Sequence, residues 1–337
     1  MRAMKYIMAA LTMMILSSCV YEYPVYIPAG TKLKLAFKLD GSVTDMYPEM
    51  TDVSDKEYDI RYVIKAYRMT NEGAYHNTPH AQFTYTKDDI TSLDSTVLVE
   101  LDEGQYKFYA LADYVPQYEV MDNFYNTRSF ADLYQYTNPY RGNTDAKTLY
   151  VGSKEVDIRV FTGEETSTDT ISLAPALSKY QIVATDLQEF YKKMTGREEI
   201  DDELVSIHMK DYKVKVRYSD TDPLYTHMNL TTGNTPTRGE TGLWFESKIT
   251  KLNETEAMLC FDHMMLGDTQ HEVTVRVGIY DKNGEHITTS PIKFPPQKGK
   301  LTCVKGNFLT YVGLENPEQG GVVIDPGFNG NFDYNSK

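Results

Sequence analysis

The sequence has 337 residues and a formal net charge of −14, from 34 Lys and Arg against 48 Asp and Glu. Such an acidic chain repels nucleic acid and anionic lipid, so we exclude both as electrostatic partners. The 27 Tyr and 13 Phe residues favour a β-rich protein, because strands readily use aromatic side chains. A glycan-binding surface is the sharper alternative explanation of the same composition.

Residues 1–18 have the pattern of a lipoprotein signal peptide. Two basic residues, Arg2 and Lys5, precede an apolar stretch of 11 residues, Tyr6 to Leu16. That stretch is too short to span a bilayer as a helix, but it has the size of a signal-peptide apolar region. It ends in Leu-Ser-Ser-Cys, which resembles a bacterial lipobox, so we predict that Cys19 is acylated and becomes the N-terminus. An ordinary secretory signal with a chance cysteine is the alternative.

Acyl chains such as palmitate would anchor the protein, since two or more chains bind a membrane stably. Val20, rather than Asp, follows the cysteine, and by the usual sorting pattern this predicts the outer membrane. Glu22 is a weak indication of the outer face. Residues 19–30 contain Pro24 and Pro28 and predict a short extended tether.

Period-two alternation predicts a first group of strands over residues 31–174. In TKLKLAFKLD, Leu33, Leu35, Phe37 and Leu39 share one face and three lysines lie on the other. The segment DIRYVIKAYRM (59–69) is apolar enough to be a central strand. Further strands are predicted at 81–86, 95–101, 106–114, 147–158 and 168–174. The run Asp102-Glu103-Gly104 predicts a hairpin between two of them.

Residues 114–143 interrupt this group with six Tyr and two Phe but no clean alternation. A long connection without secondary structure of its own is unusual unless it is functional. We therefore keep two interpretations, a loop packed over the sandwich and a ligand-facing loop whose rings stack on sugars between Tyr114 and Tyr140.

A second group of strands covers residues 175–326. Strands are predicted at 176–186, 211–219, 242–249, 255–264, 271–281, 285–294, 305–313 and 322–324. One short helix, LQEFYKKM, follows the first of them, with Thr185 as N-cap, Gln188 in the capping-box position and Gly196 at its end. Asp281-Lys282-Asn283-Gly284 predicts a hairpin turn, and residues 327–337 form a tail without periodicity.

Two such groups, split near residue 174, predict an all-β protein with two antiparallel β-sandwich domains in tandem, at 31–174 and 175–326. Nothing in the sequence resembles the βαβ alternation of a parallel sheet. Two cysteines, Cys260 and Cys303, are too few for a disulfide scaffold. They could form one disulfide or remain as two buried thiols, and both alternatives stay open.

The sequence contains none of the common catalytic motifs: no G-x-S-x-G, no H-E-x-x-H and no Gly-rich phosphate loop. His76 and His80 have helical metal-ligand spacing, but Pro79 makes a helix there unfavourable. Ser219 to Asp222 lacks the Gly and the distal Glu of an EF-hand loop. We therefore expect no catalytic residue, no metal site and no cofactor.

Several segments together resemble the fimbrillin-like lipoproteins of Bacteroidales, near their fimbrial anchor and minor-subunit proteins. They are GQYKFYALADYV, YRGNTDAKTLYVG, ALSKYQIVATDLQEF, MLCFDHM, LTCVKGNFLT and GVVIDPGFNGNFDYN. The resemblance implies two transthyretin-like sandwiches in tandem and a structural role. It also implies partner subunits bound through strand edges, where main-chain hydrogen bonds supply the affinity.

Polymerising fimbrillins lose an N-terminal strand after cleavage at an arginine, and this chain departs from that pattern. It has no Arg between Cys19 and Arg61, and Arg61 lies inside a predicted central strand. We therefore expect Leu33 to Leu39 to stay attached, as in an anchor, tip or accessory (adhesin-like) subunit. The expected location is the outer membrane, and whether the protein faces the cell surface stays open. The alternative is a surface glycan-binding lipoprotein that uses the Tyr-rich segment, including Tyr134 and Tyr136.

Overall fold

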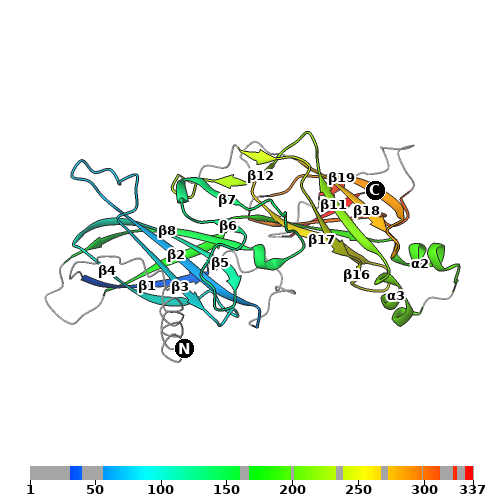
Figure 1. Ribbon diagram of the computed structural model, residues 1–337, viewed down its shortest axis with the longest axis horizontal. Helices are drawn as coiled ribbons and strands as arrows, with labels where there is room; N and C mark the ends of the chain where they lie inside the picture. Colours follow the sequence, from blue (N-terminus) through cyan, green and yellow to red (C-terminus); the bar gives the residue numbers. More distant parts are fainter. Residues whose placement is uncertain are drawn as a thin grey trace, which may run out of the picture.

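The computed structural model describes most of the chain after the predicted tether. The described residues are 31–39, 56–159, 167–198, 201–232, 238–266, 272–297, 299–311, 322–324 and 331–336. The predicted signal peptide, Cys19 and the tether lie outside them. Within these ranges no helix combines the length and apolar character needed to cross a membrane. Most of the ordered elements are strands, as Figure 1 shows.

The first half of the chain forms one seven-stranded sheet that folds over on itself. Its strands are β1 (Thr31–Leu39), β2 (Tyr58–Arg68), β3 (Ala81–Lys87), β4 (Ser95–Leu101), β5 (Gly104–Pro116), β8 (Leu149–Ile158) and β9 (Ser167–Pro175), in the order β3-β2-β5-β8-β9-β1-β4. Phe37 of β1 stacks on Tyr62 of β2 with ring centroids 5.0 Å apart, although the two strands are not neighbours in the sheet. The two layers therefore enclose a single apolar core.

The second half forms two further sheets around a second core. One has the order β16-β17-β10-β20-β22-β21 and the other β15-β11-β18-β19. Their strands are β10 (Ser178–Ala184), β11 (Lys213–Tyr218), β15 (Trp244–Lys248), β16 (Thr250–Lys251), β17 (Ala257–Met264), β18 (Val273–Tyr280), β19 (His286–Phe294), β20 (Leu301–Gly306), β21 (Val322–Ile324) and β22 (Asn331–Ser336). The rings of Tyr180 and Phe294, one from each sheet, lie 4.9 Å apart.

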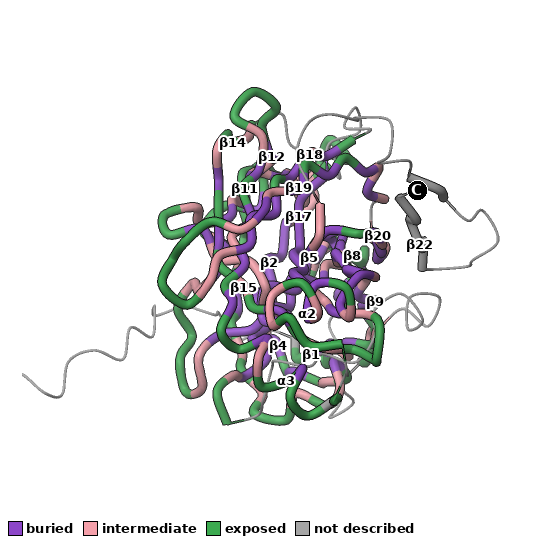
Figure 2. Tube along the Cα trace, turned by 90° about the vertical axis from the view of Figure 1, so that its right-hand side faces the viewer, coloured by how far each residue is buried: buried purple, intermediate pink, exposed green. Residues whose placement is uncertain are grey.

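The two halves repeat one strand order. In the first half, β1 lies between antiparallel β4 and parallel β9. In the second, β10 lies between antiparallel β17 and parallel β20. The other layer is β3-β2-β5-β8 in the first half and β15-β11-β18-β19 in the second. When the seven strands named here are numbered in chain order within each half, leaving out β16, β21 and β22, both halves read 4-1-7 in one layer and 3-2-5-6 in the other. Figure 1 shows the halves side by side along the long axis, and Figure 2 shows that buried residues follow the strands while exposed ones follow the loops.

Short elements fill the connections between these strands. They are β6 (Tyr125–Asn126), the 3₁₀ turn η1 (Phe130–Asp132), β7 (Leu133–Gln135), the 3₁₀ turn η2 (Asp145–Lys147), β12 (Leu224–Tyr225), β13 (His227–Met228), β14 (Gly239–Glu240) and the helices α2 (Leu187–Thr195) and α3 (Asp202–Met209). β13 of the second half pairs with β7 of the first, and β7 pairs with β6. The long connection after β5 thus belongs to both halves.

The predicted hairpin turn at 281–284 is confirmed. It joins the antiparallel pair β18 and β19, Asp281 accepts hydrogen bonds from the backbone of Asn283 and Glu285, and Gly284 has φ +82°. That backbone conformation is one that glycine adopts without steric cost.

The predicted hairpin at Asp102-Glu103-Gly104 is wrong. β4 pairs with β1, whereas β5 pairs with β2 and β8. The turn therefore carries the chain from one layer of the sandwich to the other. A local turn signal fixes the change of direction, but it does not decide which strand the next one pairs with.

The second half differs from its prediction at both ends. Helix α2 is confirmed and ends at Gly196 (φ +68°), but its N-cap is Asp186 rather than Thr185. A second helix, α3, was not predicted. Asp201 caps it by accepting hydrogen bonds from the backbone N–H groups of Glu203 and Leu204.

The predicted tail contains β22, which pairs with β20 in parallel. Parallel pairs at β1–β9, β10–β20 and β20–β22 also correct the purely antiparallel expectation.

Gly152 is a position where any side chain should be costly. It lies on β8 where that strand passes close to β9, and a Cβ there would lie 2.2 Å from the backbone oxygen of Ser172 and 3.0 Å from Ile171. Because the obstacle is main chain, the layers would have to move apart. We expect Gly152→Ala to lower the free energy of unfolding by about 1–3 kcal/mol or more, measured by denaturant unfolding. Ser153→Ala, at the exposed next position, is the control; equal midpoints for the two variants would refute the argument.

Candidate functional site: a buried polar junction between the two halves

Eight polar side chains meet where the halves join, and we call them the junction cluster. They are Tyr140, Asp145 and Lys147 from the connection after β5, Lys179 and Tyr180 of β10, Tyr218 of β11, and Asp262 and His263 of β17. None is more than 8 % exposed. Buried groups of this kind are stable only when they satisfy one another's hydrogen bonds.

Asp262 is the centre of the junction cluster. Its Oδ1 accepts from Lys147 Nζ at 2.7 Å and from the His263 backbone at 2.8 Å. Its Oδ2 accepts from the hydroxyls of Tyr140 at 2.6 Å and Tyr218 at 2.7 Å. Lys147 also donates to the Tyr140 hydroxyl at 2.9 Å. One carboxylate thus holds a lysine and a tyrosine from the first half against strands of the second.

Asp145 repeats this arrangement with the roles of the halves exchanged. Here the first half supplies the carboxylate: Lys179 Nζ donates to its Oδ1 at 2.5 Å, and His263 Nε2 lies 3.0 Å from the same oxygen. Asp145 is positioned by η2, whose N-cap Thr144 accepts from Ala146. Two ion pairs therefore cross the junction: in one the first half supplies the carboxylate, and in the other it supplies the lysine.

The electrostatics of the cluster follow from burial and pairing. Burial lowers the pKa of Lys147, and the neighbouring Asp262 carboxylate opposes that change. Burial raises the pKa of Tyr140 and of Tyr218 well above the ordinary value, so both stay protonated and donate to Asp262. Burial alone would raise the pKa of Asp145, but the hydrogen bond from His263 and the charge of Lys179 lower it to about 2.

The same junction has an apolar and a main-chain component. Gly142 lies against the ring of Phe245, where a Cβ would come within 2.6 Å of the ring carbons. On the other side, His227 of β13 pairs with Tyr134 of β7, and Asp132 lies 3.0 Å from His227. Since no member of the cluster is open to a substrate, the arrangement suits fixing the two halves to each other.

A second group of buried charges holds the Tyr-rich connection against the first half. Arg61 of β2 donates to both oxygens of Asp113, at 2.9 and 2.6 Å, and also to Asp122 and the Val120 carbonyl at 2.9 Å each. Lys65 donates to the carbonyls of residues 127 and 128. Burial lowers the pKa of Lys65 to about 8.

Burial supports the packed-loop interpretation of the Tyr-rich segment. Most of its rings lie in the interior, namely Tyr114, Phe124, Tyr125, Phe130 and Tyr140. Tyr134 and Tyr136 are half-buried and their rings pack edge to face. Tyr118 is the exception at 86 % exposed. The segment therefore offers little of the flat aromatic surface that sugar stacking needs.

Cys260 and Cys303 do not approach each other as a disulfide requires. Both are buried thiols. Cys260 of β17 pairs with Ile182 and Cys303 of β20 pairs with Gln181, so strand β10 separates them. Because Ile182 and Gln181 are consecutive on β10, the two thiols also point to opposite faces of the sheet.

The other sequence candidates do not form a metal site. Within the described ranges, no group of three or more His, Cys, Asp or Glu side chains is arranged to hold a metal ion. His76 lies on an exposed turn after β2, and the predicted lipidation site, Cys19, lies outside the described residues. The junction cluster was not predicted, although one signal was present: MLCFDHM places Asp262 and His263 inside an otherwise apolar strand.

The family model described as "Family of unknown function (DUF6562)" matches residues 28–337. No curated protein matches the chain.

Similar solved structures include a candidate cell adhesion protein from Bacteroides eggerthii, with 15% identity, a TM-score of 0.42, and coverage of 92% of this chain and 99% of that one. Another, from Bacteroides ovatus, has 11% identity, a TM-score of 0.43 and coverage of 82% and 93%. The fimbrial anchor protein Mfa2 from Porphyromonas gingivalis has 11% identity, a TM-score of 0.38 and coverage of 77% and 82%. Likenesses at this level leave the function to be argued from the chain itself.

Proposed function

The chain belongs to the family of unknown function DUF6562. We propose that it is a lipid-anchored, non-catalytic surface protein with a structural, adhesin-like role. It would act as the anchor, tip or accessory subunit of a surface fibre in the outer membrane. Cys19 would carry the lipid and residues 19–30 the tether. Residues 31–174 and 175–326 would be two transthyretin-like domains, the second extended by β22.

The position of β1 is the observation that carries the proposal. β1 pairs with β4 from Thr31 to Phe37 on one side and with β9 from Leu33 to Leu39 on the other. A strand paired on both sides cannot leave without breaking two ladders and opening the core beneath Leu35 and Phe37, which are fully buried. A subunit that keeps its first strand and the lipid attached to it suits a fixed base or accessory.

Arg61 supports the same conclusion. It is the first arginine after the tether region, but its side chain is 2% exposed and ion-paired with Asp113. A protease that recognises arginine has no access to a side chain in this position while the domain is folded. Burial of Arg61 therefore argues against the arginine-directed cleavage that removes the first strand of polymerising fimbrillins.

The sheet edges indicate where a partner strand would add. β19 is one edge of the four-stranded sheet and carries Pro291 opposite Arg276; proline on an edge strand discourages further pairing. β15 is the opposite edge, has no proline and exposes Trp244 at 47%. Of the two edges of this sheet, we therefore propose β15 for the contact with another surface subunit.

Lipidation and strand retention can be tested together on whole-cell lysates of cells that express the full chain. We expect wild type to enter the detergent phase in phase separation and Cys19→Ala to stay in the aqueous phase. Peptide mapping of the wild type is expected to find residues 31–39 and an acylated Cys19. Aqueous partitioning of both forms would overturn the anchor, and a mature chain that begins after Arg61 would overturn the retained strand.

A further inference from the structure

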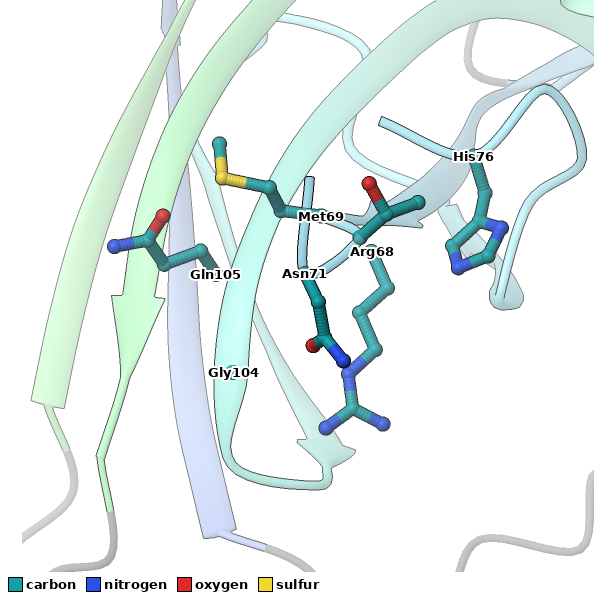
Figure 3. A pocket seen from close by; sticks show the side chains of 7 residues that line it. Arg68, Met69, Asn71, His76, Gly104 and Gln105 are labelled. Carbon is teal, nitrogen blue, oxygen red and sulfur yellow. The ribbon is translucent and has the colours of Figure 1, made fainter. Parts of the chain in front are cut away.

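A groove of about 640 Å³ lies at the end of the first half, far from the junction cluster. Seven residues line it: Arg68, Met69, Thr70, Asn71, His76, Gly104 and Gln105. They come from the end of β2, the turn that follows it and the start of β5. The junction, by contrast, meets the opposite ends of these strands, where Asp113 pairs with Leu149. Figure 3 shows the side chains of Arg68, Asn71 and His76 pointing to the same side.

The guanidinium of Arg68 is held in place at this groove. Its Nη2 donates to the Glu103 carbonyl at 2.7 Å, and it lies over the ring of Tyr106, 5.9 Å from the centroid. Gly104 leaves room for it, because a Cβ there would lie 3.0 Å from Arg68 Nε and the side chain would have to shift. Gly104 also has φ +155°, which disfavours other residues. An arginine that these contacts order in part loses less side-chain freedom on binding a ligand than an unrestrained one.

The turn beside Arg68 is ordered by its own hydrogen bonds. The Met69 backbone donates to the Gln105 carbonyl at 2.8 Å, the Thr70 backbone to Ala74 at 2.7 Å and the His76 backbone to Arg68 at 3.0 Å. Asn71 and His76 are nevertheless exposed. The turn thus presents an amide and an imidazole next to the guanidinium from a fixed backbone.

The groove lining carries one cation, Arg68, and no carboxylate. Glu72, Asp102 and Glu103 lie close to the lining residues in the sequence but do not line the groove. A guanidinium binds a carboxylate or a sulfate through two parallel hydrogen bonds. The side-chain amides, hydroxyl and imidazole of the lining can form hydrogen bonds with sugar hydroxyls. Met69 is the one large apolar side chain of the lining, so the groove does not fit an apolar ligand. We propose that this groove binds a saccharide that carries a carboxylate or sulfate group.

The proposed anchor suggests where such a saccharide would be found, and this step alone rests on the proposed function. Thr31, the first residue of β1, pairs with Leu101, and Leu101 is close in sequence to Gly104. The groove therefore lies at the end of the domain where the tether joins β1. Residues 19–30 could extend at most roughly 40 Å. An anchored protein would therefore hold the groove near its own membrane, within reach of acidic envelope polysaccharide.

Binding is tested on the full chain carrying Cys19→Ala, so that lipidation plays no part. We would titrate it by calorimetry with tetragalacturonic acid, a sulfated galactose tetramer and neutral galactotetraose. We expect saturable binding of the carboxylated or the sulfated probe, at least tenfold tighter than the neutral one; the tighter of the two identifies the anionic group. Failure of both anionic probes, or equal binding of the neutral one, would overturn the proposal without affecting the anchor.

Variants locate the site. We expect Arg68→Gln to weaken binding at least tenfold and Arg68→Lys to weaken it as well, because lysine lacks the planar fork. Asn71→Ala and His76→Ala change exposed turn residues and are expected to weaken binding without loss of fold, as circular dichroism would show. Arg217→Gln, at an exposed arginine of the second half, is the matched control. A loss at Arg217 equal to that at Arg68 would show non-specific attraction and refute the site.

Discussion

Asp262→Ala is expected to lower the free energy of unfolding by about 3–5 kcal/mol, because it leaves the Lys147 ammonium buried without its counter-charge. Lys147 and Asp262 are both fully buried, with 2.7 Å between Nζ and Oδ1. The hydroxyls of Tyr140 and Tyr218 lose their acceptor at the same time. Denaturant unfolding followed by circular dichroism and by tryptophan fluorescence measures the loss. The single tryptophan, Trp244, reports on the second half.

Two further variants decide whether the loss comes from the stranded charge. Lys293→Ala breaks an exposed ion pair with Glu272 and is expected to change stability by less than about 1 kcal/mol. The double variant Lys147→Met/Asp262→Leu removes both charges and is expected to recover part of the loss, because apolar replacements of a buried pair are often tolerated. If the double variant is less stable than Asp262→Ala, the ion pair is not the source of the effect.

The junction cluster explains how two similar halves become one body. Each half contributes a carboxylate that the other half's lysine neutralises: Asp145 with Lys179, and Asp262 with Lys147. Sliding one half along the other would break both pairs and expose four charges to an apolar interior. The cost of such a movement favours a single relative position.

Period-two alternation predicted most of the strands, because half-buried strands must alternate to keep one face in the core. TKLKLAFKLD shows this directly: Leu33, Leu35 and Phe37 are buried, while Lys32, Lys34 and Lys38 are exposed. The turn at Asp281 to Gly284 was equally readable, since its conformation depends on the residues in the turn itself.

Pairing between distant strands was not readable from the residues. Asp102 to Gly104 has the composition of a hairpin turn, but β4 and β5 belong to different layers. The parallel pairing of β1 with β9 joins residues more than 130 positions apart, and no local pattern encodes it. Helix α3 was not predictable from amphipathic spacing, because its apolar residues do not all share the buried face. Leu204 and Ile207 are exposed.

The candidate site was predicted least well, for a related reason. Asp262 was visible as a charge inside an apolar strand, but its partner Lys147 lies 115 residues away. Lys147 is the first residue of the predicted strand 147–158, where a lysine has the appearance of a surface residue. Only the packing of the halves shows that these two charges neutralise each other. Arg61 was readable as a charged residue in a central strand, whereas its partner Asp113 was not.

Arg61→Ala is expected to cost about 3–5 kcal/mol of unfolding free energy, because it strands Asp113, which is 2% exposed and otherwise held by two hydrogen bonds from the guanidinium. Burial raises the pKa of Asp113, and Arg61 opposes that rise. Without Arg61 the folded-state pKa rises further above the unfolded value. The destabilisation is then largest near pH 7 and shrinks as the pH falls and Asp113 takes up a proton. Unfolding at pH 7 and pH 5 measures this, and Arg159→Ala, which breaks an exposed pair with Asp157, is the control.

Hydrogen exchange of Arg61→Ala is expected to show faster opening at 117–123, because Arg61 holds the Val120 carbonyl in the wild type. A loss that is equal at both pH values, with unchanged exchange there, would mean that Arg61 acts by packing and not as the counter-charge of Asp113.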